Sequence, residues 1–286
     1  MNTQEAKKRI EKLKKEINHH RYLYHVLDTQ EISDAALDSL KHELKKLEDE
    51  FPQFLTPDSP TQRVGGRPLK EFKKVTHRTP MLSLEDVFSL EETQTWFERI
   101  SKIAKIPEDF FCEVKFDGLA VSLVYKKGIL REASTRGDGR MGEDVTQNIK
   151  TFESVPLALV GQKQVKENID IEVRGEIVMT KKAFEEVNRQ QRKIGLKMYA
   201  NPRNLAAGSI RQLDPAITRG RKLEFYAYDL LGDETLKTHA EKHKILKKLG
   251  FKTDPLAKET ANLHGVGFFH DAIETRGFFG ILKQAG

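Results

Sequence analysis

The sequence predicts an α+β fold, with a small helical N-terminal domain followed by a β-rich domain built from antiparallel sheets. In the first seventy or so residues, apolar side chains recur at a three/four spacing, as at Ile10, Leu13 and Ile17, which lines one face of a helix. From Phe110 onward, short runs that alternate apolar and polar residues are typical of strands. Strands mixed with segregated helices indicate the α+β class.

The helical region contains two expected helices and ends in a turn-rich segment. Ser33 is placed to cap the second helix. The apolar stripe of this second helix consists of Leu37, Leu40, Leu44 and Leu47. Pro52 ends this region, and residues 65–68, Gly-Gly-Arg-Pro, are suited to a hinge. We therefore place the domain boundaries at residues 1–68 and 69–286.

In the second domain, Ser89 and Glu92 predict a capping box before a short helix that carries Trp96. Lys126-Lys127-Gly128 predicts a hairpin turn between two strands. The expected strands are residues 110–116, 119–125, 129–134, 169–179 and 223–231. The expected helices are residues 183–194 and 239–249, each stopped by the glycine that follows, Gly195 and Gly250.

Composition narrows the classes of protein to consider. Of 286 residues, 38% are apolar, enough for a core, and the net charge of +6 is compatible with a polyanionic partner. The single cysteine, Cys112, excludes a disulfide framework and a Cys-rich zinc site. No apolar run approaches the roughly 20 residues that span a bilayer, and the N-terminus does not have the pattern of a signal peptide. We expect a cytoplasmic protein without a membrane partner.

Three ionisable residues alternate with apolar residues in the segment 113–118, which reads Glu-Val-Lys-Phe-Asp-Gly and could carry out catalysis. On a strand, Glu113, Lys115 and Asp117 would share one face, with the intervening side chains in the core. One interpretation is a salt-bridged surface strand. The other is a lysine nucleophile, which attacks only when neutral and needs burial or nearby positive charge to lower its pKa. Gly118 permits a tight turn or a close approach.

Two further motifs carry charges beside glycines. Residues 135–139, Thr-Arg-Gly-Asp-Gly, form a loop that can bring Arg136 against a phosphate or ribose, or an ordinary Asp-Gly turn. In residues 172–176, Glu-Val-Arg-Gly-Glu, alternate side chains share a face, so Glu176 could bind a ribose hydroxyl or a metal ion, or take part in a cross-strand ion pair.

Residues 201–212, Asn-Pro-Arg-Asn-Leu-Ala-Ala-Gly-Ser-Ile-Arg-Gln, combine small residues with two arginines. In this order and spacing, the motifs resemble those of bacterial NAD⁺-dependent DNA ligases. Residues 20–25, 32–35 and 56–66 also resemble the small helical domain of these NAD⁺-using enzymes. The resemblance covers roughly residues 5 to 250.

The resemblance implies a nucleotidyltransferase fold, described as an ATP-grasp-like ligase adenylation domain, and a three-step reaction. Lys115 would attack the α-phosphate of NAD⁺, forming lysyl-AMP and releasing nicotinamide mononucleotide (NMN). AMP would then pass to the 5′-phosphate of a nick in double-stranded DNA, and the 3′-hydroxyl would seal the strand during replication and repair. Mg²⁺ would offset charge at the reacting phosphate, and the enzyme would act as a monomer.

The resemblance also implies a role for individual residues. Lys115 is the expected catalytic residue. The expected nucleotide-binding residues are Ser83, Leu84, Glu113, Asp117, Arg136 and Glu176, with Glu113 recognising adenine. The residues expected to hold the NMN half are Tyr24, His25, Asp34 and Asp38. The residues expected to face the DNA backbone are Arg203, Arg211 and Arg221.

Two departures from the family pattern lead to further expectations. Leu37 stands where the family has a tyrosine that would stack on nicotinamide, a loss on the order of 1 kcal/mol. An Asp-Gly-hydrophobic-hydrophobic-x-Lys strand and a Lys-Phe-Pro segment do not follow Gly250. We therefore expect an adenylation domain that is incomplete at its C-terminus, with an aberrant tail from about residue 251 and impaired self-adenylation.

Two alternatives remain at this point. One is a catalytically impaired remnant that binds nucleotide or DNA without forming an adduct. The other is an ATP-dependent ligase or capping-type transferase, against which Tyr24, His25 and Asp34 argue.

Overall fold

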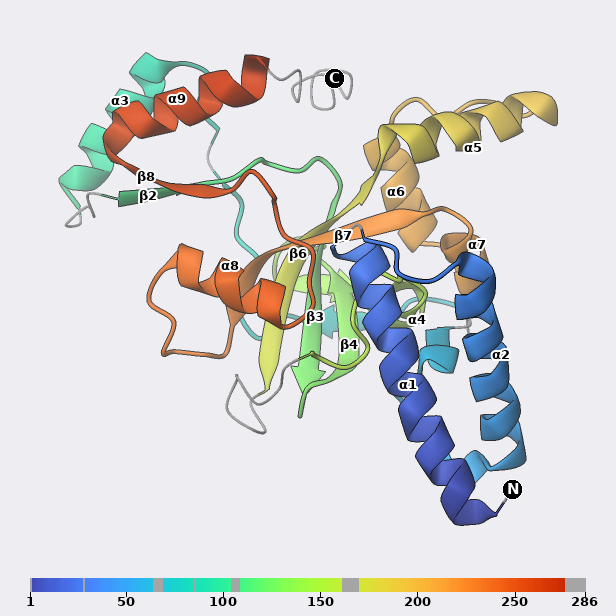
Figure 1. Cartoon of the computed structure of the whole chain (residues 1–286). Helices are drawn as coiled ribbons and strands as arrows, with labels where there is room; N and C mark the ends of the chain where they lie inside the picture. The colour runs from blue at the N-terminus through green and yellow to red at the C-terminus, as the bar shows by residue number, and fades with distance from the viewer. Residues whose placement is uncertain are drawn as a thin grey trace.

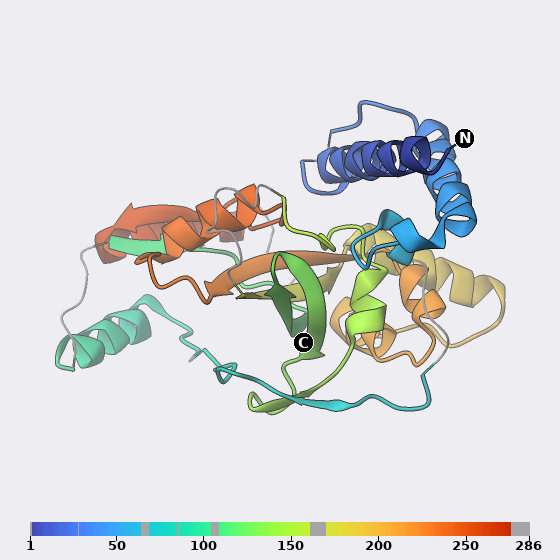
Figure 2. The same ribbon diagram turned by 90° about the horizontal axis from the view of Figure 1, so that it is seen from below.

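A computed structural model describes residues 2–27, 29–63, 69–84, 86–103, 109–160 and 170–275. A helical hairpin lies at one end of a four-stranded antiparallel sheet, and a small unit of two strands and two helices lies at the other end (Figures 1 and 2). The expected hinge at residues 65–68 lies outside the described residues. Within the described residues, no helix is long and apolar enough to cross a membrane.

The helical hairpin forms because two amphipathic stripes face each other. Helices α1 (Thr3–His25) and α2 (Asp34–Glu50) bury their apolar stripes together. The buried residues are Ile10, Leu13, Ile17, Leu44 and Leu47, with Leu37 and Leu40 partly buried against them. Ser33 caps α2 by accepting a hydrogen bond from the Ala36 amide, as the sequence predicts.

The central sheet has the strand order β4-β3-β6-β7, and all its pairs are antiparallel. Its strands are β3 (Leu119–Lys126), β4 (Ile129–Thr135), β6 (Ile171–Met179) and β7 (Leu223–Leu231). One face carries the main core, which includes Leu123, Tyr125, Val173, Ile177 and Phe225. The other face is polar, and this division positions the candidate site.

The turn between β3 and β4 shows why the sequence folds locally as predicted. Lys127 has φ +50° and Gly128 has φ +72°, so both loop residues lie in the left-handed region. A two-residue loop with this backbone matches the right-handed twist of the flanking strands. The predicted hairpin is confirmed.

The remaining elements surround the sheet. The helices are α3 (Leu90–Ser101), α4 (Thr146–Lys150), α5 (Lys181–Lys193), α6 (Pro202–Ile210), α7 (Pro215–Arg219), α8 (His239–Lys248) and α9 (Asn262–Thr275). Short 3₁₀ turns cover Pro52–Phe54 and Pro60–Arg63. Strand β1 (Lys74–Thr76) pairs with β5 (Met141–Glu143), and β2 (Asp109–Cys112) pairs with β8 (Lys258–Ala261). Gly195 and Gly250 adopt positive φ after α5 and α8, as predicted.

Part of the region from residue 251 has regular structure. Strand β8 completes a ladder with β2, and α9 packs Phe269 and Ile273 against Cys112. The last two elements of the described chain therefore form a small core with the segment that leads to Lys115.

Two local predictions are wrong. The strand expected over residues 110–116 ends at Cys112, because its only described partner, β8, begins at Lys258, opposite Cys112. Beyond that point the Val114 amide donates to the Asp254 side chain at 2.7 Å instead of to a neighbouring strand. The Ser89 cap exists, but Glu92 accepts from the Phe88 amide, so the reciprocal bond of a capping box is absent there.

Two buried arginines attach the helical hairpin to the second domain. Arg63 is 5% exposed; it donates to the Val155 carbonyl at 2.8 Å and to the Phe152 carbonyl, and it lies 3.6 Å from Glu153. Arg21 donates to the Glu153 carbonyl. Because buried carbonyls need donors, these contacts couple the stability of the two parts.

We expect Arg63→Ala to lower the free energy of unfolding by about 2–4 kcal/mol, since it leaves two buried carbonyls without their donor and removes the cation that lies 3.6 Å from Glu153. Urea unfolding followed by circular dichroism measures this change. Arg9→Ala is the matched control, because Arg9 pairs with Glu43 at the surface and should contribute about 0–1 kcal/mol. Equal losses in the two variants would contradict the assigned role of Arg63.

Candidate active site

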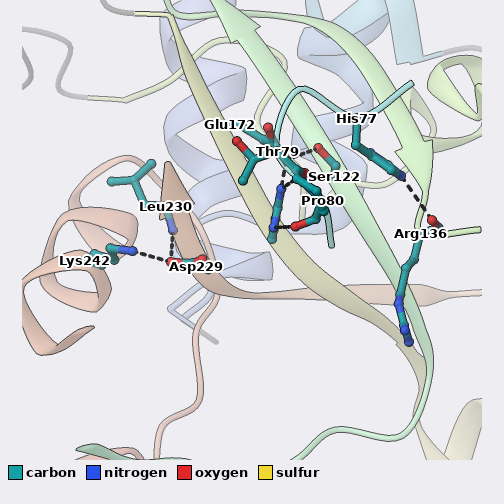
Figure 3. A network of polar contacts seen from close by, with 10 residues as sticks. His77, Thr79, Pro80, Ser122, Arg136, Glu172, Asp229, Leu230 and Lys242 are labelled. Carbon is teal, nitrogen blue, oxygen red and sulfur yellow. Dashed lines mark hydrogen bonds and ion pairs between the residues drawn. The ribbon is translucent and has the colours of Figure 1, made fainter. Parts of the chain in front are cut away.

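The polar face of the sheet is organised around one buried arginine. Arg174 on β6 is 7% exposed and donates to Glu172 at 2.8 Å. It also donates to the Pro80 carbonyl at 3.0 Å and to the Thr79 carbonyl. Ser122 on β3 donates to the same Glu172 carboxylate at 2.9 Å (Figure 3). The network ties the segment that leads to Ser83 and Leu84 onto the sheet.

The segment that leads to Ser83 brings together two residues that were predicted to bind nucleotide. The Ser83 hydroxyl accepts a hydrogen bond from Arg136, so two residues that are far apart in the sequence meet at the edge of the polar face. Leu84 is 79% exposed and contributes an apolar surface there. Exposed apolar surface beside fixed polar groups is a common feature of ligand sites.

The loop that carries Arg136 is held by its own backbone. Gly137 and Gly139 have φ of +57° and +93°, which an L side chain rarely adopts. Asp138 accepts from the Arg140 and Met141 amides, and these bonds hold the pKa of Asp138 below its usual range. The Arg136 carbonyl lies 3.1 Å from His77 Nε2 (Figure 3). The loop is therefore preorganised, which would suit a contact to a phosphate or ribose.

The segment around Lys115 is not a strand, and its acidic residues turn to different partners. Asp117 accepts from Arg203 on α6 at 3.1 Å. Glu113 instead lies 3.0 Å from His243 and 3.6 Å from His239 on α8. The expectation that three charges converge from one strand is therefore wrong. Phe116 stacks on Tyr226 at 4.4 Å, on the polar side of the sheet instead of in the core.

Lys115 itself is exposed, so the burial expected for a nucleophilic lysine is not found. The neighbouring glycine shows how tightly the segment meets β6. A Cβ atom at Gly118 would lie 2.0 Å from the Ile177 carbonyl oxygen, so only glycine fits there. This close approach brings Lys115 near Glu176, whose titration it affects.

Glu176 is the most perturbed carboxyl group of the candidate site. Burial raises its pKa to about 7, and Asp117 adds to the rise, while Lys115 and Arg203 act in the opposite direction. Tyr226 on β7 lies opposite Glu176 in the sheet register. A carboxyl group poised near neutral pH in a polar recess is a feature of functional sites.

The residues expected to hold NMN form a second group. Tyr24 is 43% exposed and meets His25 edge-on at 4.8 Å. Burial lowers the pKa of His25 to about 4, so its ring is neutral at physiological pH. Asp38 is exposed and lies 3.9 Å from Lys41, and the Asp34 side chain lies outside what the structure describes. The charged residues that shift the pKa of His25 differ from those that shift the pKa of Glu176, so the two groups of residues have separate electrostatic surroundings.

The arginines expected to face DNA have protein partners in this structure. Arg211, at the end of α6, donates to Glu143 at 2.7 Å, and Arg203 pairs with Asp117. Both side chains are more than half exposed. Arg221 lies over the Tyr199 ring at 5.7 Å.

Sequence reasoning missed that Glu113 faces His239 and His243, and that Asp254 accepts a hydrogen bond from the neighbouring Val114 amide. The two histidines lie four residues apart on the predicted helix, and that spacing was a readable signal because it places both rings on one face. Asp254 gave no such signal. One cavity of about 420 Å³, between α1 and residues 158–160, contains none of the predicted site residues.

Comparison with known proteins identifies the family of this chain. Residues 69–280 match the NAD-dependent DNA ligase adenylation domain model. The chain belongs to this family. Residues 3–65 match the model described as DNA ligase-like, N-terminal NAD⁺-binding domain. The predicted resemblance is thereby confirmed, together with the α+β class and the helical region that precedes antiparallel sheets.

Curated relatives support the assignment. The chain is 46% identical over 264 residues to a DNA ligase of Acetivibrio thermocellus and to one of Thermoanaerobacter pseudethanolicus, covering 92% of this chain and 39% of each relative. A Myxococcus xanthus DNA ligase is 44% identical over 273 residues, covering 94% of this chain and 40% of the relative. The chain thus spans about two fifths of the length of these ligases.

We expect Glu176→Gln to change how stability depends on pH. Because the folded-state pKa of about 7 exceeds the 4.5 of an unperturbed glutamate, this carboxyl group contributes stability below about pH 4.5 that is lost as the pH rises through 7. Relative to wild type, the variant should gain about 1–3 kcal/mol between pH 5 and pH 8.

Thermal unfolding at a series of pH values measures this difference. Glu185→Gln is the control, because Glu185 is exposed on α5. A pH profile of Glu176→Gln that is parallel to that of wild type would refute the raised pKa.

Proposed function

We propose that this chain performs the adenylation step of an NAD⁺-dependent DNA ligase. The neutral amine of Lys115 would attack the α-phosphorus of NAD⁺, forming a P–N bond while the bond to the NMN oxygen breaks. NMN would leave, and AMP would remain on the lysine. The observation that carries the proposal is the position of Lys115 beside Glu176, within the region that matches the adenylation model.

In this proposal Glu176 has a direct part in activating Lys115. The amine must lose a proton before it attacks, and a carboxyl group with a pKa of about 7 is suited to accept a proton near neutral pH. Arg136, paired with Ser83 from the tethered segment, would hold a phosphate or the ribose. Glu113 would recognise adenine. The protein's main contribution would be alignment and charge stabilisation.

Residues of the helical hairpin would hold the NMN half. Tyr24 offers an exposed ring, and the neutral ring of His25 avoids repulsion with the positive nicotinamide. Asp34 and Asp38 would contact the adjoining ribose. Leu37 packs against the hairpin core instead of offering a stacking ring.

Mg²⁺ would support the same chemistry. A divalent cation would fit at Glu176 in place of the lysine proton, because burial leaves this carboxyl group undercompensated and either positive charge would compensate it. Bound there with the nucleotide phosphates, it would neutralise charge on the transferring group.

The later steps would act on nicked double-stranded DNA. Arg203 and Arg211 lie on the surface near α6 and would exchange their carboxylate partners for DNA phosphates. The AMP would pass to the 5′-phosphate, and attack by the 3′-hydroxyl would release it. We place this activity in the cytoplasm, in a protein that acts as a monomer.

Incubation with NAD⁺ and Mg²⁺ followed by intact-mass spectrometry tests the first step. We expect one AMP adduct on wild type and none on Lys115→Arg, which keeps the charge but cannot be deprotonated to attack. Glu176→Gln should slow adduct formation at least tenfold at pH 7.

The nucleotide used and the site of attachment decide between candidates. An adduct on Lys115→Arg equal to that on wild type would refute the assigned nucleophile. An adduct from ATP but not NAD⁺ would indicate the ATP-dependent class. NAD⁺ binding without any adduct would favour a protein that binds nucleotide only.

A separate measurement tests the DNA contacts. We expect Arg203→Ala and Arg211→Ala each to weaken binding to a nicked duplex and to reduce the slope of log affinity against log salt by about 1. Fluorescence anisotropy over a salt series provides both values. Arg131→Ala, at an exposed position on β4, is the control. Unchanged slopes in the first two variants would contradict this DNA-binding surface.

A further inference from the structure

Glu113, His239 and His243 place three ligand atoms around one point. Glu113 Oε2 lies 3.0 Å from His243 Nε2 and 3.6 Å from His239 Nε2. The three ligand atoms all lie within 4.8 Å of one another. Ligands bound at about 2.0–2.2 Å to one tetrahedral ion lie roughly 3.3 Å apart, so small side-chain movements would complete such an arrangement.

The surrounding residues hold these side chains in place. The two histidines are four residues apart on α8, so both rings leave the same helix face. The Phe111 ring packs on both, at 5.1 Å from the His239 ring and 4.6 Å from the His243 ring. On the other side, Asp254 accepts from the Val114 amide at 2.7 Å and so fixes the backbone next to Glu113.

Several buried polar atoms at the centre of this cluster make no hydrogen bond of normal geometry with any described residue. His243 is 4% exposed, and neither of its ring nitrogens makes a hydrogen bond within the described residues. Glu113 Oε2 is likewise buried without a hydrogen bond, although His243 Nε2 is only 3.0 Å away. Unsatisfied buried atoms are uncommon in folded proteins, and a bound ion is one way to satisfy them.

We propose that Glu113, His239 and His243 bind a divalent transition-metal cation, of which Zn²⁺ suits the ligands best. Two imidazoles and one carboxylate form a common ligand set for zinc, and three protein ligands leave a fourth position open. Glu113 and His239 are each about one third exposed, so an ion can reach the cluster from solvent.

Isothermal titration calorimetry of the tag-free full chain with Zn²⁺ tests the site. We expect one ion per chain, with affinity at least tenfold lower in His239→Ala and in His243→Ala. His264→Ala is the matched control, since His264 is exposed on α9 and belongs to none of the candidate ligand clusters. Visible absorption of the Co²⁺ form should show d–d bands that the first two variants lose.

Two outcomes would overturn the site. Wild type that does not bind Zn²⁺ in the micromolar range excludes it. Undiminished affinity in both histidine variants would place the ion elsewhere, for instance at His19, His20 and Glu31. Because His243 is buried, circular dichroism must show that His243→Ala folds, and the more exposed His239→Ala gives the answer independently if it does not.

A consequence follows that rests on the proposed function. A cation bound by Glu113 would compete with adenine for the same carboxylate. Zn²⁺ should therefore slow AMP-adduct formation on wild type at least tenfold more than on His243→Ala. Equal inhibition of the two proteins would remove this consequence, whereas absence of any adduct without zinc would count against the adenylation proposal alone.

Discussion

The hydrogen bonds of Arg174 are the interaction on which the candidate site depends. Its guanidinium lies on the polar face of the sheet, joins Glu172, and holds the carbonyls of Thr79 and Pro80. Because a buried cation without partners is costly, the segment before Ser83 is fixed to β6 wherever the sheet forms. The pairing of Ser83 with Arg136, and hence the edge of the proposed nucleotide site, follows from that attachment.

Glu176 lies on the same face as Arg174, but no close ion pair among the described residues balances its charge. Arg174 and Glu172 compensate each other, whereas burial leaves Glu176 undercompensated even with Lys115 nearby. A group in this state gains from any added cation or proton. The fold therefore provides a site for a proton or a cation beside Lys115. This site lowers the free energy of unfolding above neutral pH.

The elements with local causes could be predicted from the sequence. The hairpin at Gly128, the cap at Ser33 and the helix stop at Gly250 depend on a few neighbouring residues. The end of β2 at Cys112 could not be predicted, because it is set by the register of a partner almost 150 residues later in the chain. The residue types near Lys115 were sufficient to identify the family. They did not predict that Glu113 faces α8 or that Asp117 faces α6.

The structure positions the proposed nucleophile, Lys115, in a different way from the one that a strand would provide. The Lys115 segment is anchored on one side, where Glu113 faces the histidines of α8, and on the other, where Asp117 pairs with Arg203. Gly118 then passes within contact distance of β6. Two anchors two residues away on either side restrict the lysine backbone while its side chain stays accessible to a dinucleotide. Loss of either anchor should therefore disturb the geometry of the proposed attack more than the stability of the sheet.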